Sequence, residues 1–337
     1  MNTYIRAAAL AVLKTYAQDH GLPLRPIMAR YRLAPEVLDS ADREIPFLSA
    51  IAILEECARE WQIPDLGVQL GKKQSFDAIG VVALVVRMER TVRDAVQAVL
   101  RNLFLHTNAV IVELRELPGG KYAELSMDVR SEGTGARQYR EMSLCGVKND
   151  LIAIAGRNPV FVKARVPHGP SKGREILSRE LNCPVEYHAR SCAVVFEADI
   201  LDLAIPQSDI AFHPIIKRYL VEATQEKQRD FTEVVRLEIF RQMSSGEVSQ
   251  DKVADAMRLQ KRTLQRRLKE AGTSFRELLD GERKRKALTL VQQTRLSMFE
   301  VAMALGYSDQ TAFNQAFKRW YGRNPLAIRR EDDRRTA

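Results

Sequence analysis

The first hundred residues carry apolar side chains at intervals of three and four, the spacing of amphipathic helices. This spacing predicts helices over Thr3–Tyr16, Ile27–Leu33, the segment after Pro46, Asp65–Lys73, and Val92–His106 with Thr91 as its N-cap. The apolar segment Phe76–Met88 is compatible with either a strand or a buried helix. We favour a helix, because Gly80 and Ala83 would allow a neighbouring helix to approach closely.

The pattern changes to alternation of apolar and polar positions near residue 110. Two alternating runs, 110–115 and 122–129, are separated by Pro118-Gly119-Gly120, so they predict a β-hairpin. Further strands are predicted over Val160–Val166, Val185–His188 and Cys192–Phe196, and helices over Ala136–Ala155, Ser171–Leu181 and Asp209–Thr224. The first two thirds of the chain are therefore expected to be α+β.

Only helical spacing occurs from Phe231 onward. Helices are predicted at about 231–243, 250–257, 261–271, 274–293, 297–304 and 309–321, with a short one after Pro325. The segment Thr224–Asp230 is polar and has no apolar periodicity, which is typical of a linker. We therefore predict one domain at 1–222, a linker at 223–229 and an all-α domain at 230–337.

The stretch 250–271 reads as two short helices joined by a tight turn. Val253, Ala254, Met257 and Leu259 give the first helix an apolar side, and Leu264 and Leu268 do so for the second. The residues left outward on the second helix are Lys261, Arg262, Gln265, Arg266 and Lys269. Arginine pairs with guanine edges and glutamine with adenine edges, so this face suits DNA. On its own, the stretch is equally compatible with a solvated charged face.

The stretch 297–321 repeats this arrangement. Its first helix is expected to bury Phe299, Val301, Ala302 and Leu305, and its second Phe313, Phe317 and Trp320. Gly306 suits the reversal between the helices, and Ser308 or Asp309 would cap the second one. The outward residues are Gln310, Thr311, Asn314, Gln315 and Lys318. Two such units predict an all-α domain with paired helix-turn-helix motifs joined by a long helix at 274–293.

The positive charge of the chain is concentrated in the same region. The net charge is +9 over 337 residues. Nearly all of the excess lies beyond Thr224, whereas the preceding part is close to neutral. This asymmetry favours a nucleic-acid-binding domain joined to a neutral domain with a different task.

The second half of the chain resembles the AraC/XylS family of bacterial transcription regulators. The resemblance lies in TLQRRLKEAGTSFRELLDGERKRKAL and LSMFEVAMALGYSDQTAFNQAFKRWYGRNP. It implies that both second helices enter successive major grooves on one face of double-stranded DNA. By motif position, base contacts are implied for Arg262, Gln265, Arg266, Gln310, Thr311, Asn314 and Gln315. Candidates for phosphate contacts, which the motif does not place, are Lys261, Thr263, Lys269, Lys318 and Arg319. The run Arg283–Lys286 could also face DNA, although a solvated face is the simpler interpretation.

The first two thirds resemble the α+β sensing domain of the arabinose-binding-like branch of that family. The similar segments are ARYRLAPEVLDSADREIPFLSAIAILEECARE, the FDAIGVVAL run and LNCPVEYHARSCAVVFEADILDLAIP. The resemblance implies a small-molecule effector, which it does not name. It also implies RNA polymerase and a second copy of the chain as partners, and activation as the commoner outcome. The alternatives are a DNA-binding protein without an effector and a DNA-repair or other enzymatic fusion.

Residues suited to catalysis or metal binding are scattered. The histidines form no HxxxH or HExxH pattern, and GxSxG, P-loop and GxGxxG motifs are missing from the sequence. We therefore expect a protein without catalytic, cofactor or metal sites. His106 is read as a core or surface histidine, and Arg137–Arg140 as a polar helix start or a site for an acidic effector.

The cysteines and the N-terminal segment indicate the cellular compartment in which the protein is expected. The four cysteines are separated, although Cys183 and Cys192 could meet across strands, and we expect reduced thiols. The apolar run Ala7–Leu13 is short and reads as part of an amphipathic helix rather than a signal peptide. No apolar run reaches the ~18 residues that a membrane span requires. A cytoplasmic protein without membrane contact is expected.

Overall fold

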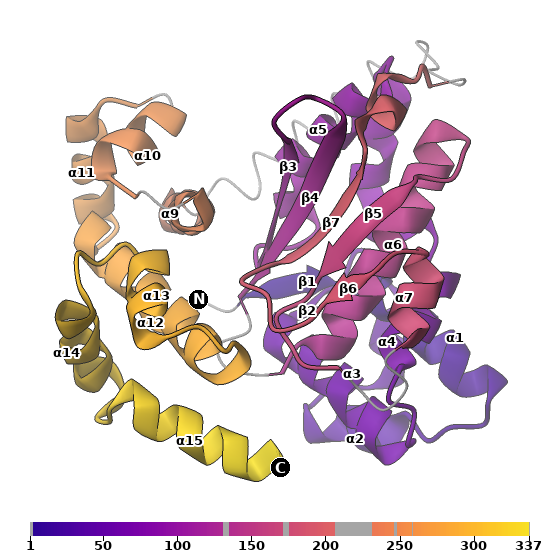
Figure 1. The fold of residues 1–337 in the computed structure, drawn as a ribbon, viewed down its shortest axis with the longest axis horizontal. Coiled ribbons are helices and arrows are strands. Elements are labelled where there is room, and N and C mark those ends of the chain that lie inside the picture. The colour runs from indigo at the N-terminus through magenta and orange to yellow at the C-terminus, as the bar shows by residue number, and fades with distance from the viewer. Residues whose placement is uncertain are drawn as a thin grey trace. The chain divides into compact units, whose positions relative to one another are not determined.

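The computed structural model describes residues 3–130, 135–170, 175–205, 231–245, 248–257 and 259–336. The chain forms two compact units (Figure 1). The N-terminal unit comprises Asn2–Val129 and Thr134–Thr224, and the C-terminal unit Gln225–Ala337 together with Met1 and Arg130–Gly133. The predicted helix Asp209–Thr224 and the predicted linker lie outside the described residues, so the proposed domain boundaries remain a prediction.

A five-stranded sheet forms the centre of the N-terminal unit. Its strands, in spatial order, are β3 (Val110–Glu116), β4 (Tyr122–Val129), β7 (Cys192–Glu197), β5 (Phe161–Arg165) and β6 (Val185–Glu186). Neighbouring strands are antiparallel except for β5 and β6, which are parallel. The predicted hairpin is confirmed: Val110 pairs with Val129, and Gly119 and Gly120 adopt the positive φ that its turn requires.

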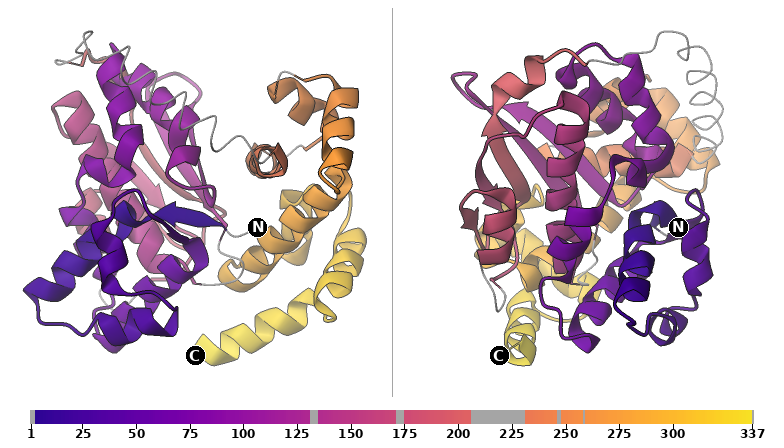
Figure 2. Two further views of the ribbon diagram at one scale, coloured as in Figure 1. Left: turned by 180° about the vertical axis from the view of Figure 1, so that it is seen from behind. Right: turned by 90° about the vertical axis from the view of Figure 1, so that its right-hand side faces the viewer.

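Helices surround this sheet and pack against one another. They are α1 (Ala11–Asp19), α2 (Arg25–Arg30), α3 (Phe47–Glu60), α4 (Leu66–Lys73), α5 (Val92–Asn102), α6 (Arg137–Ala155) and α7 (Glu175–Leu181). Helices α5 and α6 lie along one face of the sheet (Figure 2). Helices α4 and α6 approach closely at Gly67, where only a glycine fits. Any side chain at this position would collide with the backbone of Gln138. The N-cap predicted at Thr91 is confirmed, since its side chain accepts from the Asp94 N–H at 3.1 Å.

Two of the predicted helices of this unit are confirmed only in part. Residues 3–16 begin with strand β1 (Tyr4–Arg6), continue as the 3-10 helix η1 (Ala7–Leu10) and become α-helical only at α1. Strand β1 pairs with β2 (Glu44–Pro46), so a partner distant in sequence overrides the local spacing. The segment η3 (Phe76–Met88) is a run of 3-10 turns interrupted at Gly80, whose φ of 63° ends regular helix.

One other strand is shorter in the structure than in the prediction, and one helix is described only in part. The strand predicted over Val185–His188 ends at Glu186, because His188 has a φ of 58°, outside the range of a strand. Helix α7 begins its described part at Glu175, and residues 171–174 of the predicted helix lie outside the described residues. The remaining short elements are the 3-10 helices η2 (Pro35–Asp39), η4 (Leu103–Leu105) and η5 (Ala198–Asp202).

The described C-terminal unit is helical, as predicted. Its helices are α9 (Phe231–Ser245), α10 (Gln250–Ala256), α11 (Lys261–Glu270), α12 (Phe275–Gln293), α13 (Met298–Ala304), α14 (Gln310–Tyr321) and α15 (Pro325–Thr336). Figure 1 shows α12 running between the α10–α11 pair and the α13–α14 pair. Helix α15 spans 12 residues and is longer than the short helix expected there.

Side-chain caps set where these helices begin. Ser274 and Ser297 each form a capping box, with Glu277 and Glu300 respectively. Asp309, rather than Ser308, caps α14 by accepting the Ala312 N–H at 2.8 Å. Each cap satisfies N–H groups that lack a partner within the helix, so the starts of α12, α13 and α14 are fixed locally.

A buried ion pair lies in the C-terminal unit. Glu282 on α12 is 1% exposed and accepts hydrogen bonds from Arg130, one of them from Nε at 3.1 Å. Glu233 on α9 accepts a further bond from Arg130 at 3.2 Å. Removing one partner from a buried pair is strongly destabilising, because the remaining charge stays buried with fewer compensating groups.

Candidate nucleic-acid interface and ligand cavity

Helix α11 buries one face and exposes a basic one. Leu264 and Leu268 are 0% and 1% exposed, so they hold the helix against the core of the unit. The residues predicted to face outward are all exposed: Lys261, Arg262, Gln265, Arg266 and Lys269. A stripe of basic and amide side chains therefore runs along the solvent side of a firmly packed helix.

The outward residues of α11 have only weak or exposed partners. Lys261 lies 2.9 Å from an Asp251 carboxylate oxygen, and Gln265 donates to Gln250 at 3.2 Å. Arg266 and Glu270 are 3.9 Å apart, at the limit of an ion pair, and both are exposed. Within the described part of the chain no partner is found for Arg262. Exposed pairs contribute about 0–1 kcal/mol, so phosphate or base contacts can replace them at little cost.

Helix α14 presents a less charged face. Phe313 and Phe317 are fully buried, and Thr311, Gln315 and Lys318 are exposed, as the sequence predicts. Gln310 and Asn314 are half-buried rather than outward. The Asn314 Oδ1 is enclosed and has no hydrogen-bond partner among the described residues. The exposed amide and hydroxyl groups of α14 are suited to base edges in the major groove.

The prediction that α13 buries Phe299 is wrong. Phe299 is 54% exposed, whereas Met298 is 5% exposed. The capping box at Ser297 fixes the start of the helix, and Met298 then falls on the face that Val301 and Leu305 share. Phe299 is the next residue along the helix, so its side chain points away from this buried face. Trp320, predicted as buried, is half-buried and donates its ring N–H to Asp280 at 2.9 Å.

Arg283 holds the turn of the second helix-turn-helix unit. It donates to the Leu305 carbonyl at 2.9 Å and to the Gly306 carbonyl at 2.8 Å, and its guanidinium lies 4.6 Å from the centre of the Tyr307 ring. Gly306 itself has a φ of 72°, the left-handed conformation expected of it. Arg283 is therefore a structural residue of α12.

The rest of the Arg283–Lys286 run also packs within the unit. Arg285 forms an ion pair with Glu282, and the Lys284 ammonium lies 5.2 Å from the centre of the Tyr321 ring. The Lys286 ammonium is 5.8 Å from the Phe240 ring. Arg283, Arg285 and Lys286 are half-buried, so the interpretation of a simply solvated face fits only Lys284, which is exposed. Arg319, a candidate for a phosphate contact, lies 2.6 Å from a carboxylate oxygen of Asp280.

One functionally relevant cation was missed from the sequence. Arg329 on α15 donates to the carbonyls of Val291 at 2.8 Å and Leu296 at 2.6 Å. It thus satisfies backbone acceptors at and after the end of α12 and ties α15 to the long helix. Only the Arg-rich composition of the segment after Pro325 hinted at this role.

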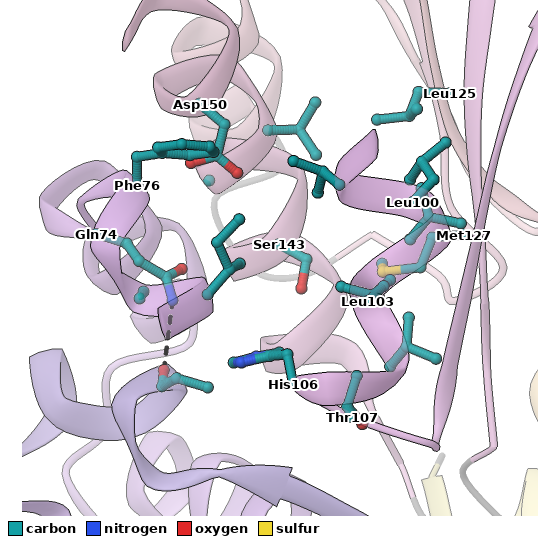
Figure 3. Close-up of a pocket in the computed structure, with 18 of the residues that line it drawn as sticks. Gln74, Phe76, Leu100, Leu103, His106, Thr107, Leu125, Met127, Ser143 and Asp150 are labelled. Atoms are coloured by element: carbon teal, nitrogen blue, oxygen red, sulfur yellow. Dashed lines mark hydrogen bonds between the residues drawn. The ribbon is translucent and has the colours of Figure 1, made fainter. Parts of the chain in front are cut away.

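The N-terminal unit contains a cavity of about 150 Å³ between the sheet and its covering helices. Its walls come from η3, α5, α6, β3 and β4 (Figure 3). Leu100, Leu125 and Met127 form an apolar side opposite Gln74 and Asp150, and Ser143 and His106 lie between the two sides (Figure 3). A mostly apolar cavity with a few polar groups is the usual form of a small-molecule site.

Burial strongly shifts the pKa of ionisable groups that line the cavity. Burial raises the pKa of Asp150 to about 8. Burial, and to a smaller extent the charge of Arg6, lowers the pKa of His106 to about 4. The Nδ1 of His106 has no hydrogen-bond partner among the described residues, and the side chain is 5% exposed. His106, read from the sequence as an ordinary histidine, therefore lines the cavity.

The Arg137–Arg140 cluster forms the start of α6 and is mostly enclosed. Arg137 lies 3.0 Å from Glu141, and the Gln138 side chain accepts the Gly67 N–H at 2.7 Å. Tyr139 lines the cavity, and burial raises its pKa, so its hydroxyl stays protonated. The helix-start interpretation of this cluster is confirmed, and Tyr139 is the member that reaches the cavity.

Other kinds of site find little support in the described residues. All four cysteines are free and buried, so Cys183 and Cys192 form no disulfide. In the ranges that the structure describes, no three His, Cys, Asp or Glu side chains gather as metal ligands would. None of the helices described there combines the length and apolar character that crossing a bilayer demands.

Two family models match separate parts of the chain, one in the N-terminal unit and one in the C-terminal unit. The model of the arabinose-binding N-terminal domain of AraC transcription regulators matches residues 21–205, and a helix-turn-helix domain model matches residues 253–331. The HTH-type transcriptional regulator VirS of Mycobacterium tuberculosis is 25% identical, over 98% of this chain and 97% of its own length. The ornithine utilization regulator of Pseudomonas aeruginosa is 24% identical, over 96% and 95% respectively.

One solved structure resembles nearly the whole chain. The transcriptional regulator CdpR of Pseudomonas aeruginosa covers 91% of this chain and 96% of its own, with 22% identity and a TM-score of 0.43. The domain matches are the stronger finding, because the first of them spans more than half of the chain and the second includes α11 and α14. The chain belongs to the AraC family of helix-turn-helix transcription regulators.

Proposed function

We propose that this protein is an effector-responsive transcription activator that inserts α11 and α14 into successive major grooves of its promoter DNA. The observation that carries the proposal is the pairing of two helices with buried apolar faces and exposed polar faces. Successive grooves on one face of DNA recur about every 34 Å, and a long helix such as α12 can space two readers accordingly.

The residues of α11 and α14 divide into two groups by chemistry. Base contacts are assigned to Arg262, Gln265, Arg266, Gln310, Thr311, Asn314 and Gln315, and phosphate contacts to Lys261, Lys269 and Lys318. Arginine and the amides can make two hydrogen bonds to one base edge, whereas lysine acts as a point charge on phosphate. The half-burial of Gln310 and Asn314 supports shorter reach for these two than for Gln315.

The DNA part of the proposal is tested by comparing its own promoter region with random DNA of equal length. A sequence-specific regulator should bind the promoter at least ~10³ times more tightly at physiological salt. Footprinting should show two protected segments about one helical turn apart. Equal affinity for both DNAs would refute specific regulation and would favour the alternative of a general DNA-binding protein.

The effector part assigns the cavity of the N-terminal unit to a small molecule. Occupation of the cavity would shift the population of conformations that bind DNA, associate with a second copy of the chain or contact RNA polymerase. A transcription reporter carrying the promoter tests the sign of the response: activation requires that deletion of the gene lower expression. Higher expression after deletion would identify a repressor instead.

A further inference from the structure

The cavity lining contains one carboxyl group, and none of the described residues pairs with it. Asp150 lies on α6 with its side chain at the cavity (Figure 3). Its neighbours in sequence are engaged elsewhere: Lys148 lies 2.9 Å from Glu180, and Asn149 donates to the carbonyls of Gly71 at 2.9 Å and Gln74 at 3.0 Å. No hydrogen bond or ion pair of Asp150 is found in the described part of the chain.

The remaining polar groups of the cavity do not neutralise a carboxylate. The lining residues include neither lysine nor arginine. His106 stays neutral at physiological pH, because its pKa is lowered to about 4. Gln74 donates to the Ala9 carbonyl at 3.4 Å, a weak bond. Asp150 is half-buried and faces the cavity, and ionisable groups whose pKa is perturbed in a cavity cluster at functional sites.

From these observations we infer that the effector is a small primary amine with an apolar body, whose ammonium group pairs with Asp150. This inference rests on the proposed role of the cavity as the effector site. An ammonium supplies both the missing charge and the missing donors, and the apolar side formed by Leu100, Leu125 and Met127 receives the carbon chain. An anionic effector would meet an acid and no cation in the lining.

The size of the cavity limits the ligand. A cavity of about 150 Å³ is the volume that accepts benzene in an engineered protein core, so about six non-hydrogen atoms fit. Three ligands of nearly this size share one carbon chain and differ only in the head group: n-pentylamine is a cation, 1-pentanol is neutral and pentanoate is an anion. Comparing their affinities separates recognition of the charged head group from burial of the ligand's carbon chain.

The test is calorimetric titration of the full chain with each of the three ligands at pH 7. We expect n-pentylamine to bind at least about tenfold more tightly than 1-pentanol, and pentanoate to bind most weakly, because a charged hydrogen bond adds to the same apolar burial. In Asp150→Asn the amine and the alcohol should bind within about twofold of each other. Asp77→Asn, an exposed change on η3, should keep the wild-type preference.

A second measurement needs no variant. Asp150, whose pKa is about 8, is mostly protonated in the empty cavity at pH 7 and must ionise to pair with an ammonium. Amine binding should therefore release about one proton, seen as a dependence of the heat on the buffer's ionisation enthalpy. Binding of 1-pentanol should release none.

Several results would overturn the inference. These are equal affinity for amine and alcohol, tightest binding of pentanoate, an amine preference that survives Asp150→Asn, or no binding of any of the three. Promoter affinity measured on the same preparation separates this outcome from failure of the proposed function. Specific DNA binding without a preference for the amine would refute only the inferred amine effector. Loss of promoter specificity would refute the proposed function as a transcription regulator.

Discussion

Replacing Asp150 by asparagine should stabilise the N-terminal unit in the absence of ligand. The pKa of Asp150 is raised by burial from 3.8 to about 8. Between these values the unfolded chain has lost its proton while the folded chain keeps it. The free energy of unfolding therefore falls as pH rises, by about 1.4 kcal/mol per pH unit.

The size of this effect at pH 7 follows from the interval between pH 3.8 and pH 7. Over that interval the wild-type protein loses roughly 4 kcal/mol that a neutral side chain would not lose. The asparagine amide is itself left unpaired in the cavity and offsets part of the gain, at about 1–3 kcal/mol. We expect Asp150→Asn to raise the free energy of unfolding by roughly 1–3 kcal/mol at pH 7 and to confer no such gain near pH 4.

Urea unfolding of wild type and variant across pH 4–8 measures this difference. His106, with a pKa near 4, and Glu141, whose pKa burial raises to about 7, also titrate in this window. Their contributions are common to both proteins and cancel in the comparison. Asp77→Asn serves as the control for loss of a carboxyl from an exposed position. A stability difference that is independent of pH, or a variant less stable than wild type at pH 7, would refute the reasoning.

Three further predictions concern the C-terminal unit. Arg266→Ala should cost about 1–3 kcal/mol of promoter affinity and relax specificity at one base pair, whereas a uniform loss on all DNA sequences with a shallower salt slope would make Arg266 a phosphate contact. Glu282→Ala should lower the free energy of unfolding by about 3–5 kcal/mol in urea denaturation, because Arg130 would keep a buried charge without its main partner; a cost below about 1 kcal/mol would contradict this account. Arg283→Ala removes two hydrogen bonds to carbonyls of the second turn and should destabilise the unit by roughly 1–3 kcal/mol in the same assay, and unchanged stability with weaker DNA binding would instead return Arg283 to the DNA surface.

The elements that the sequence predicted well are those whose signals are local. The hairpin of β3 and β4 is specified by alternation and by a Pro-Gly-Gly turn within one short stretch. The two helix-turn-helix units are specified by apolar spacing, and in the second unit by capping residues next to α13 and α14 as well. Phe299 shows the limit of spacing alone: the choice between it and Met298 depends on where the helix starts, and the Ser297–Glu300 capping box decides that.

The features that escaped prediction depend on contacts distant in sequence. Strand β1 forms because it pairs with β2, about forty residues further along the chain. The residues near Ile5 contain no local pattern that predicts this pairing. The polar groups of the cavity come from the residues before η3, the residues after η4 and helix α6, and they meet only in the folded unit. Arg283 looked like one member of a charged run, because its carbonyl partners lie more than twenty residues further along the chain.

The two proposed DNA-reading helices differ in how their charge is used. On α11 the basic side chains are exposed and bound only to other exposed groups, so their attraction for phosphate is available and should weaken with salt. On α14 Arg319 is paired with Asp280, which leaves Lys318 as the exposed lysine beside Thr311 and Gln315. Hydrogen bonds from hydroxyl and amide groups release few counterions, so contacts made by α14 should depend less on salt. Under the proposed function, α11 then supplies most of the electrostatic affinity and α14 more of the discrimination between bases.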